Sequence, residues 1–158
     1  MSEYIIYLKL PPYLAQWLRH EDDRIPLEFP KNSMENDIIE LGLMRKPILA
    51  NVQGPGDNVV AIGLPNFKNK DVKKYNYLPI AARRSLMQCI RSRFAVQLWK
   101  DLHKFGNIGR RKQDLIYAWM EAHGIEKNDT NWNTIAKIYM RKRDVYRRRH
   151  RQNKDQDG

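Results

Sequence analysis

The feature that most constrains the fold lies in the second half of the chain, where apolar residues recur at helical spacing after Pro79, the last of eight prolines. From residue 81 to about residue 105, apolar side chains return every three or four positions, which predicts one long helix. Gly106 would end this helix. Its buried stripe would consist of Leu86, Ile90, Phe94, Leu98, Leu102 and Phe105.

Two further helices are predicted after the first. The second would run from about residue 110 to residue 123, with Gly124 as its C-terminal cap. The third would be capped by Thr130 or Asn131, and neither glycine nor proline interrupts it before His150. Its buried stripe would consist of Trp132, Ile135, Ala136, Tyr139 and Tyr146.

The first half of the chain predicts strands and short helices instead. Runs of β-branched and aromatic residues, bounded by proline and glycine turns, are typical of strands. The predicted strands cover residues 3–10, 25–29, 48–52 and 59–64, of which the last two would form a hairpin.

Two helices accompany these strands. One would open at Pro12, and the other would be capped by Asn32 or Ser33. The second would bury Met34, Ile38, Leu41 and Met44. The chain is therefore predicted to be α+β, with a small mixed sheet and two helices in residues 1–78, a basic three-helix unit in residues 79–151 and a frayed tail in residues 152–158.

The charge is unevenly distributed along the chain. Residues 1–79 contain ten basic and ten acidic side chains, whereas residues 80–151 contain 18 basic and six acidic ones. Like charges gathered in one half of a chain repel one another, so a polyanionic partner is the natural reason to tolerate them. Arginine outnumbers lysine there, and its planar fork matches phosphate oxygens and the guanine edge.

The third predicted helix carries the densest basic pattern. One face, away from the apolar stripe, carries Lys137, Arg141, Arg148 and Arg151, and Arg143, Arg147 and Arg149 flank it. Only Asp144 opposes these charges. Because an α-helix fits the major groove of DNA, this helix is expected to reach phosphates and guanine edges.

A second basic cluster lies at the start of the second predicted helix and consists of Arg110, Arg111 and Lys112. Cations at that end oppose the helix dipole, so helix stability does not explain them. We expect them to contact phosphates with the help of exposed backbone amides. The candidate nucleic-acid-binding residues are therefore Arg110, Arg111, Lys112, Lys137, Arg141, Arg143, Arg147, Arg148 and Arg151.

Asp114-Leu115-Ile116 and Trp119 would lie on one helix, and the next helix would begin with Trp132-Asn133-Thr134-Ile135-Ala136-Lys137. With this pattern, residues 114–149 resemble Myb/SANT or homeodomain-like helix-turn-helix units. The resemblance implies that the last helix reads the major groove. The chain departs from that family where residues 138–145 offer no turn. The whole chain also resembles small basic proteins of prophages and other mobile elements, which implies a regulatory or DNA-maintenance role.

The sequence gives no support to catalysis or to metal binding. The run from His20 to Asp23 is consecutive, and consecutive side chains rarely converge on one ion. The single cysteine, Cys89, excludes an internal disulfide and a thiolate zinc cluster. No glycine-rich loop precedes Lys-Ser or Lys-Thr, so a P-loop is absent. We expect no enzyme activity, no cofactor and no metal.

The expected location is the cytoplasm. The first thirty residues lack the apolar core of a signal peptide. No apolar run approaches the ~20 residues that a membrane span requires. A membrane-spanning protein is therefore not expected.

The favoured hypothesis is a double-stranded DNA-binding protein that acts as a transcriptional or mobile-element regulator. RNA binding stays an alternative hypothesis. RNA bases could stack on Tyr75, Tyr77 or Trp99, although no RNP-like strand is visible. A nuclease or recombination accessory factor is another alternative, as is an acidic protein or a membrane surface as the partner. The neutral N-terminal part could also form a homo-oligomer or recruit a partner.

Overall fold

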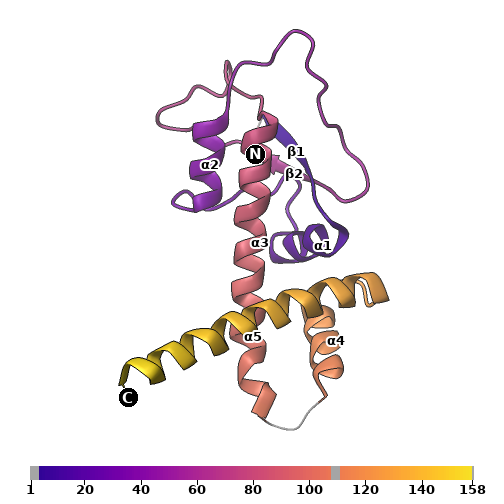
Figure 1. The fold of residues 1–158 in the computed structure, drawn as a ribbon. Coiled ribbons are helices and arrows are strands. Elements are labelled where there is room, and N and C mark those ends of the chain that lie inside the picture. The colour runs from indigo at the N-terminus through magenta and orange to yellow at the C-terminus, as the bar shows by residue number, and fades with distance from the viewer. Residues whose placement is uncertain (1–3, 108–110, 158) are drawn as a thin grey trace. The chain divides into compact units, whose positions relative to one another are not determined.

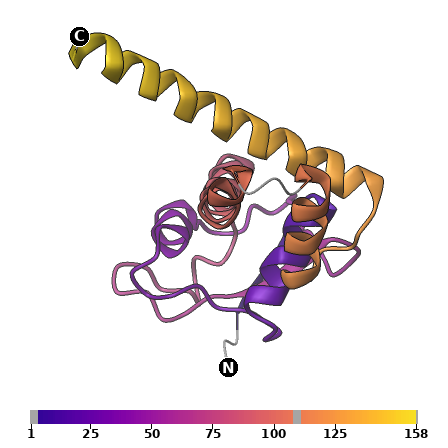
Figure 2. The same cartoon turned by 90° about the horizontal axis from the view of Figure 1, so that it is seen from below.

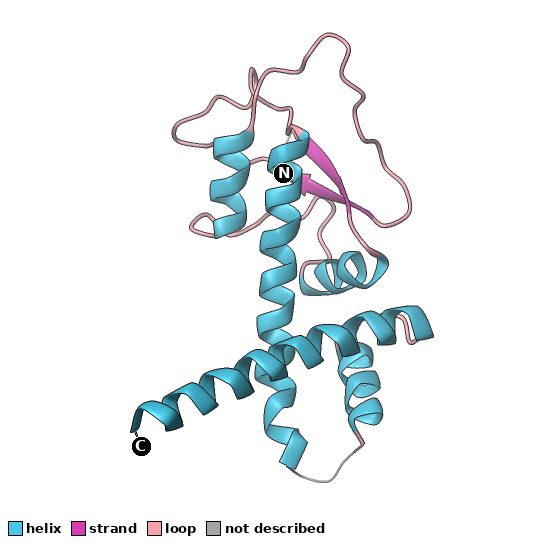
Figure 3. Ribbon diagram, viewed as in Figure 1, coloured by secondary structure: helices cyan, strands magenta, loops and turns pink. Residues whose placement is uncertain are grey.

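The computed structural model describes residues 4–107 and 111–157 and has an α+β fold, as the sequence predicts (Figure 3). It contains two compact units, residues 1–91 and residues 92–158. Helix α3 (Ile80–Leu102) contributes to both units. The proposed boundary between residues 78 and 79 stays a prediction.

The sheet of the first unit pairs two strands, β1 (Ile5–Lys9) and β2 (Val59–Gly63), in antiparallel order. Ile6 stands opposite Ile62, and both are buried because alternate side chains of a strand face the same side. Leu27 adds a single parallel bridge to Ile62 on the other edge of β2. The strands that were predicted at residues 3–10 and 59–64 are thereby confirmed.

Helices α1 (Pro12–Glu21) and α2 (Met34–Gly42) complete the first unit together with the first part of α3 (Figure 1). Pro12 occupies the first turn of α1, where its missing N–H is no loss. The Ser33 hydroxyl caps α2 by accepting from the backbone N–H of Asn36 at 3.2 Å. Gly42 lets α2 pass close to α3, because an added Cβ would lie 2.5 Å from Ala82 Cβ.

Three expectations for the first unit are wrong, two about strands and one about helix α2. Residues 25–29 make one bridge, at Leu27, and no strand, because Pro26 and Pro30 cannot donate to a ladder. Residues 48–52 form no strand, and Ile48 is 100% exposed, because Leu27 takes the free edge of β2 instead.

The inner face of α2 also differs from the predicted stripe. Leu41 is 82% exposed and Met34 is 66% exposed, and Met44 lies beyond the end of the helix. The buried residues are Glu35, Asn36 and Ile39. Asn36 faces inward because its side-chain amide donates to the carbonyl oxygens of Phe29 and Pro30, so a polar anchor rather than apolar spacing sets the rotation of the helix.

The second unit contains the last turns of α3, a 3₁₀ turn (His103–Asn107), α4 (Lys112–Ala122) and α5 (Asp129–Asp157) (Figure 1). All three predicted helices are therefore present. Phe94 of α3 meets Trp119 of α4 edge to face, with ring centroids 5.3 Å apart. The Trp119 indole N–H donates to Asp101 at 2.9 Å, which ties α4 to α3.

The turns between these helices follow local chemistry. Gly124 adopts φ 70° after the end of α4, the left-handed conformation that favours glycine, and this confirms the predicted cap. The Asn128 side chain accepts from the backbone N–H of Asn131 at 2.8 Å, so α5 begins slightly earlier than predicted. Residues 152–157 of the expected frayed tail belong to α5, which contains no helix-breaking residue, and the fraying itself stays a prediction.

Candidate nucleic-acid interface

Helix α5 is anchored in the second unit by part of the apolar stripe that the sequence predicts, whereas Tyr146, which was expected to be buried, is 44% exposed. Ile135, Ala136 and Tyr139 are buried. The Trp99 ring of α3 lies 5.5 Å from the Tyr139 ring and 5.4 Å from the Tyr146 ring, measured between centroids. Trp99 is thus a packing residue and not an exposed surface for stacking bases. The anchored part of α5 also contacts α4 (Figures 1 and 2).

The opposite side of α5 carries four of the predicted site residues. Nine residues separate Arg148 from Tyr139, which is about two and a half helical turns, so the two side chains point in opposite directions. We call the four site residues on this side of the helix the outer-face group: Lys137, Arg141, Arg148 and Arg151. All four are exposed. Across residues 4–107 and 111–157, none of them forms an ion pair.

Two other arginines of α5 lie on its inner side. Arg143 follows Tyr139 by four residues, about one turn, and therefore points toward the packed side of the helix. Its side chain is only 27% exposed, and its Nε lies 3.8 Å from Asp144 Oδ1. Arg147 follows one turn later and lines the same cavity as Arg143. Arg143 does not share a face with the outer-face group, whereas Arg147 is exposed and lies about one turn before Arg151.

The basic cluster at the start of α4 is divided in the structure. Arg110 lies outside the described residues. Arg111 is exposed at the N-cap, where its side chain caps no backbone amide. Lys112 is half-buried; its Nζ contacts Met140 Sδ and lies 5.9 Å from the centroid of the Tyr139 ring. The expected joint phosphate contact by all three residues stays a prediction.

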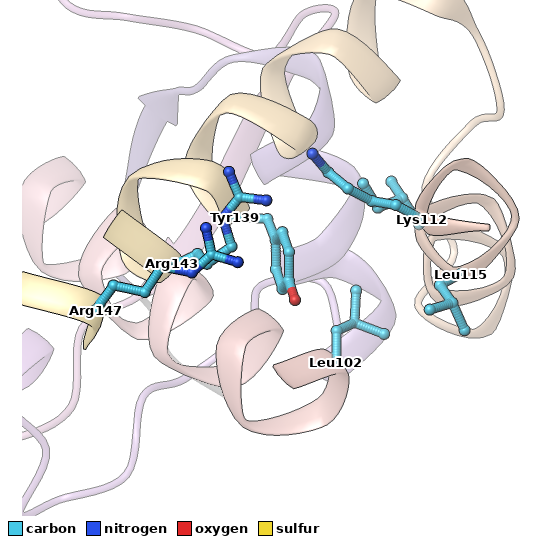
Figure 4. A pocket seen from close by; sticks show the side chains of 7 residues that line it. Leu102, Lys112, Leu115, Tyr139, Arg143 and Arg147 are labelled. Atoms are coloured by element: carbon cyan, nitrogen blue, oxygen red, sulfur yellow. The ribbon is translucent and has the colours of Figure 1, made fainter. Parts of the chain in front are cut away.

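Lys112 joins Arg143 and Arg147 in one cavity of about 210 Å³ (Figure 4). The two guanidinium groups lie on one side of the Tyr139 ring, and Lys112 lies on the other. We call these three residues the cavity group. Burial lowers the pKa of Lys112, and the Arg143 charge lowers this pKa further, whereas Asp144 raises it. The surroundings of Lys112 therefore disfavour its positive charge.

Sequence reasoning missed two features of α5. Lys154 belongs to helix α5, and an uninterrupted run without glycine or proline was the available signal. Tyr146 and His150 pair their rings at a centroid distance of 4.2 Å on the exposed part of the helix. Their spacing of four residues is the signal for such a pair.

Comparison with protein-family models, with curated proteins and with solved structures finds no match. Within the described ranges, no group of three or more His, Cys, Asp or Glu residues is arranged to hold a metal ion. None of the helices described combines the length and the apolar character needed to cross a membrane. The two basic groups of the second unit are thus the principal chemical feature from which a function can be inferred.

Proposed function

We propose that the protein binds double-stranded DNA through the outer face of α5 and acts as a transcriptional or mobile-element regulator. The observation that carries the proposal is the outer-face group itself. Its four cations are exposed, they share one side of a helix, and no acidic partner neutralises them in the described parts of the chain. An α-helix with such a face matches the width and the potential of the major groove.

The anchoring of α5 supports this role. Its buried residues, Ile135 and Tyr139, hold the helix from one side and leave the opposite side free for a ligand. The helix also continues well past the packed residues, with residues 144–156 all exposed (Figure 2). A polyanion could therefore contact several turns of α5 without displacing any core side chain.

A direct test compares two variants with the same loss of charge. Lys137, Arg141 and Arg148 are replaced together by alanine in the first variant. The matched control replaces three exposed lysines of the first unit, Lys31, Lys46 and Lys73. Both variants lose three positive charges, so non-specific attraction falls equally in both.

The expected result is a loss of duplex affinity of roughly 10²–10³-fold for the outer-face variant, at about tenfold per charge-assisted contact. The slope of log K against log salt should fall by about three, since each lost phosphate contact removes ~0.9. The control should keep the slope of the unchanged protein. Equal losses in the two variants, measured by fluorescence anisotropy, would contradict an interface on α5.

Competition separates this proposal from its RNA and nuclease alternatives. Duplex DNA should compete better than single-stranded or double-stranded RNA of the same sequence, because the major groove of A-form RNA is too narrow for a helix. Stronger binding of single-stranded RNA would favour base stacking on the exposed Tyr146–His150 pair instead. Incubation with plasmid and Mg²⁺ should leave the plasmid intact, and nicking would favour a nuclease.

A further inference from the structure

The cavity group forms a second concentration of positive charge, separate from the outer face. Lys112 comes from α4, and Arg143 and Arg147 come from α5, so residues about thirty positions apart in the sequence meet at one cavity. The remaining lining is apolar or aromatic and consists of Leu102, Leu115, Ile116 and Tyr139 (Figure 4). No acidic side chain lines this cavity within the described residues.

The position of Arg143 is not explained by the stability of the fold. The Nε atom of Arg143 is buried and has no hydrogen-bond partner in the described structure. A buried guanidinium donor without an acceptor is unfavourable. Asp144, at 3.8 Å from this atom, is too far for a hydrogen bond, and its own side chain is 51% exposed. Three cations thus meet at the cavity, with Asp144 as a distant and half-exposed counter-charge to Arg143.

A duplex bound to the outer face would not reach Arg143. Arg143 and Arg148 are five residues apart, so they point about 140° apart around the helix. Besides α5, the cavity is lined by α4 and the last turn of α3, which contribute Lys112 and Leu102.

We propose that this cavity binds a phosphate group attached to a small organic body, of the nucleoside monophosphate class. The phosphate lies against Arg143 and Arg147, whose guanidinium forks match its oxygens, and Lys112 adds its charge from the other side of the Tyr139 ring. The organic body rests against the Tyr139 ring and the leucine side chains. A volume of about 210 Å³ is below the ~300–1,000 Å³ of sites for larger ligands, so the cavity takes the phosphate and the group next to it.

The same phosphate chemistry has two sources, a free nucleotide and the 5′-phosphate end of a DNA strand. Calorimetric titrations with adenosine 5′-monophosphate, adenosine, inorganic phosphate and a single-stranded oligonucleotide with or without a 5′-phosphate distinguish them. Adenosine should not bind, and inorganic phosphate should bind at least tenfold more weakly than the nucleotide. Tighter binding of the phosphorylated oligonucleotide than of both the nucleotide and the unphosphorylated strand would identify a DNA end as the source.

The variants make the site specific. Arg143→Met together with Arg147→Met should weaken nucleotide binding at least tenfold, whereas Arg141→Met together with Arg148→Met, with the same charge loss on the same helix, should leave it unchanged. For duplex DNA, the outer-face variant should weaken binding and the cavity variant should leave it unchanged. A failure of this inference is therefore distinguishable from a failure of the proposed function. Circular dichroism establishes whether each variant folds. If the variant with Arg143 and Arg147 replaced does not fold, Lys112→Met is used as the cavity variant instead.

Three results would overturn the inference. The first is no detectable binding of the nucleotide at 5 mM. The second is equal weakening of nucleotide binding by the cavity and outer-face variants, which would indicate attraction by net charge alone. The third is binding of inorganic phosphate as tight as that of the nucleotide, since the apolar wall would then contribute nothing.

Discussion

Asp101 provides the sharpest test of how the second unit is held together. Its carboxylate accepts hydrogen bonds from Trp119 Nε1 and from Gln97 Nε2, each at 2.9 Å, and Trp119 is 5% exposed. Asp101→Ala removes both bonds and leaves the indole N–H without its acceptor. Hydrogen bonds to a charged group contribute ~1.5–3 kcal/mol each, and the carboxylate is partly exposed, so we expect a loss of about 2–4 kcal/mol in the free energy of unfolding.

The dependence on pH separates the charge from the hydrogen bonds. Burial alone would raise the pKa of Asp101, but hydrogen bonds from Trp119 and Gln97, together with the charges of His123 and Lys104, outweigh burial and lower this pKa. A carboxyl whose pKa is lower in the folded state stabilises fully above its unfolded value of about 4 and loses this contribution as pH falls through the folded value. Asp101→Asn should therefore be less stable than the unchanged protein at pH 7, and the difference should shrink below pH 4.

Urea unfolding followed by tryptophan fluorescence measures both effects, because Trp99, Trp119 and Trp132 all belong to the second unit. Gln97→Ala serves as a control that removes one bond and keeps the Trp119 bond, and it should cost about half as much. A change below ~0.5 kcal/mol for Asp101→Ala would refute the role assigned to this carboxylate.

Further predictions address local conformation and salt. Gly42→Ala should lower the melting temperature of the first unit by an amount equivalent to ~1–3 kcal/mol, because the new Cβ would collide with Ala82, and an unchanged calorimetric transition would argue against this close approach. Ser33→Ala should cost about 1 kcal/mol in urea unfolding through loss of the α2 cap. Gly124→Ala should cost about 1 kcal/mol, since φ 70° is unfavourable for alanine, and Gly124→Asn should cost less. Raising salt from 50 to 200 mM should weaken duplex binding by about 10²-fold for four phosphate contacts, and a flat anisotropy response would contradict the interface.

The helices of the second half could be predicted because their signals are local. Apolar spacing identifies the buried stripe that contains Ile135 and Tyr139, and Gly124 ends a helix through its own backbone preference. The expected hairpin at residues 48–52 failed because strand pairing is decided by the partner. Leu27 occupies the edge of β2, and the β-branched residues after Pro47 find nothing to pair with.

The candidate site shows the same division between local and tertiary information. Helical periodicity places Arg141 and Arg148 on the side of α5 away from Tyr139, and the structure has them exposed. Nothing in the sequence joins Lys112 to Arg143, because their meeting depends on how α4 packs against α5. A cavity assembled from two helices is therefore outside the reach of pattern analysis.

The long exposed end of α5 lets one helix combine a packed first part with a highly charged second part, residues 147–157, which we call the arm. Each residue advances the helix by about 1.5 Å, so residues 147–157 extend about 16 Å past Tyr146. Residues 147–156 of this arm are all exposed, so the repulsion among its arginines acts on the arm and not on a buried side chain. A bound polyanion would remove that repulsion and favour its last turns, which makes ordering of the helix end part of the binding equilibrium.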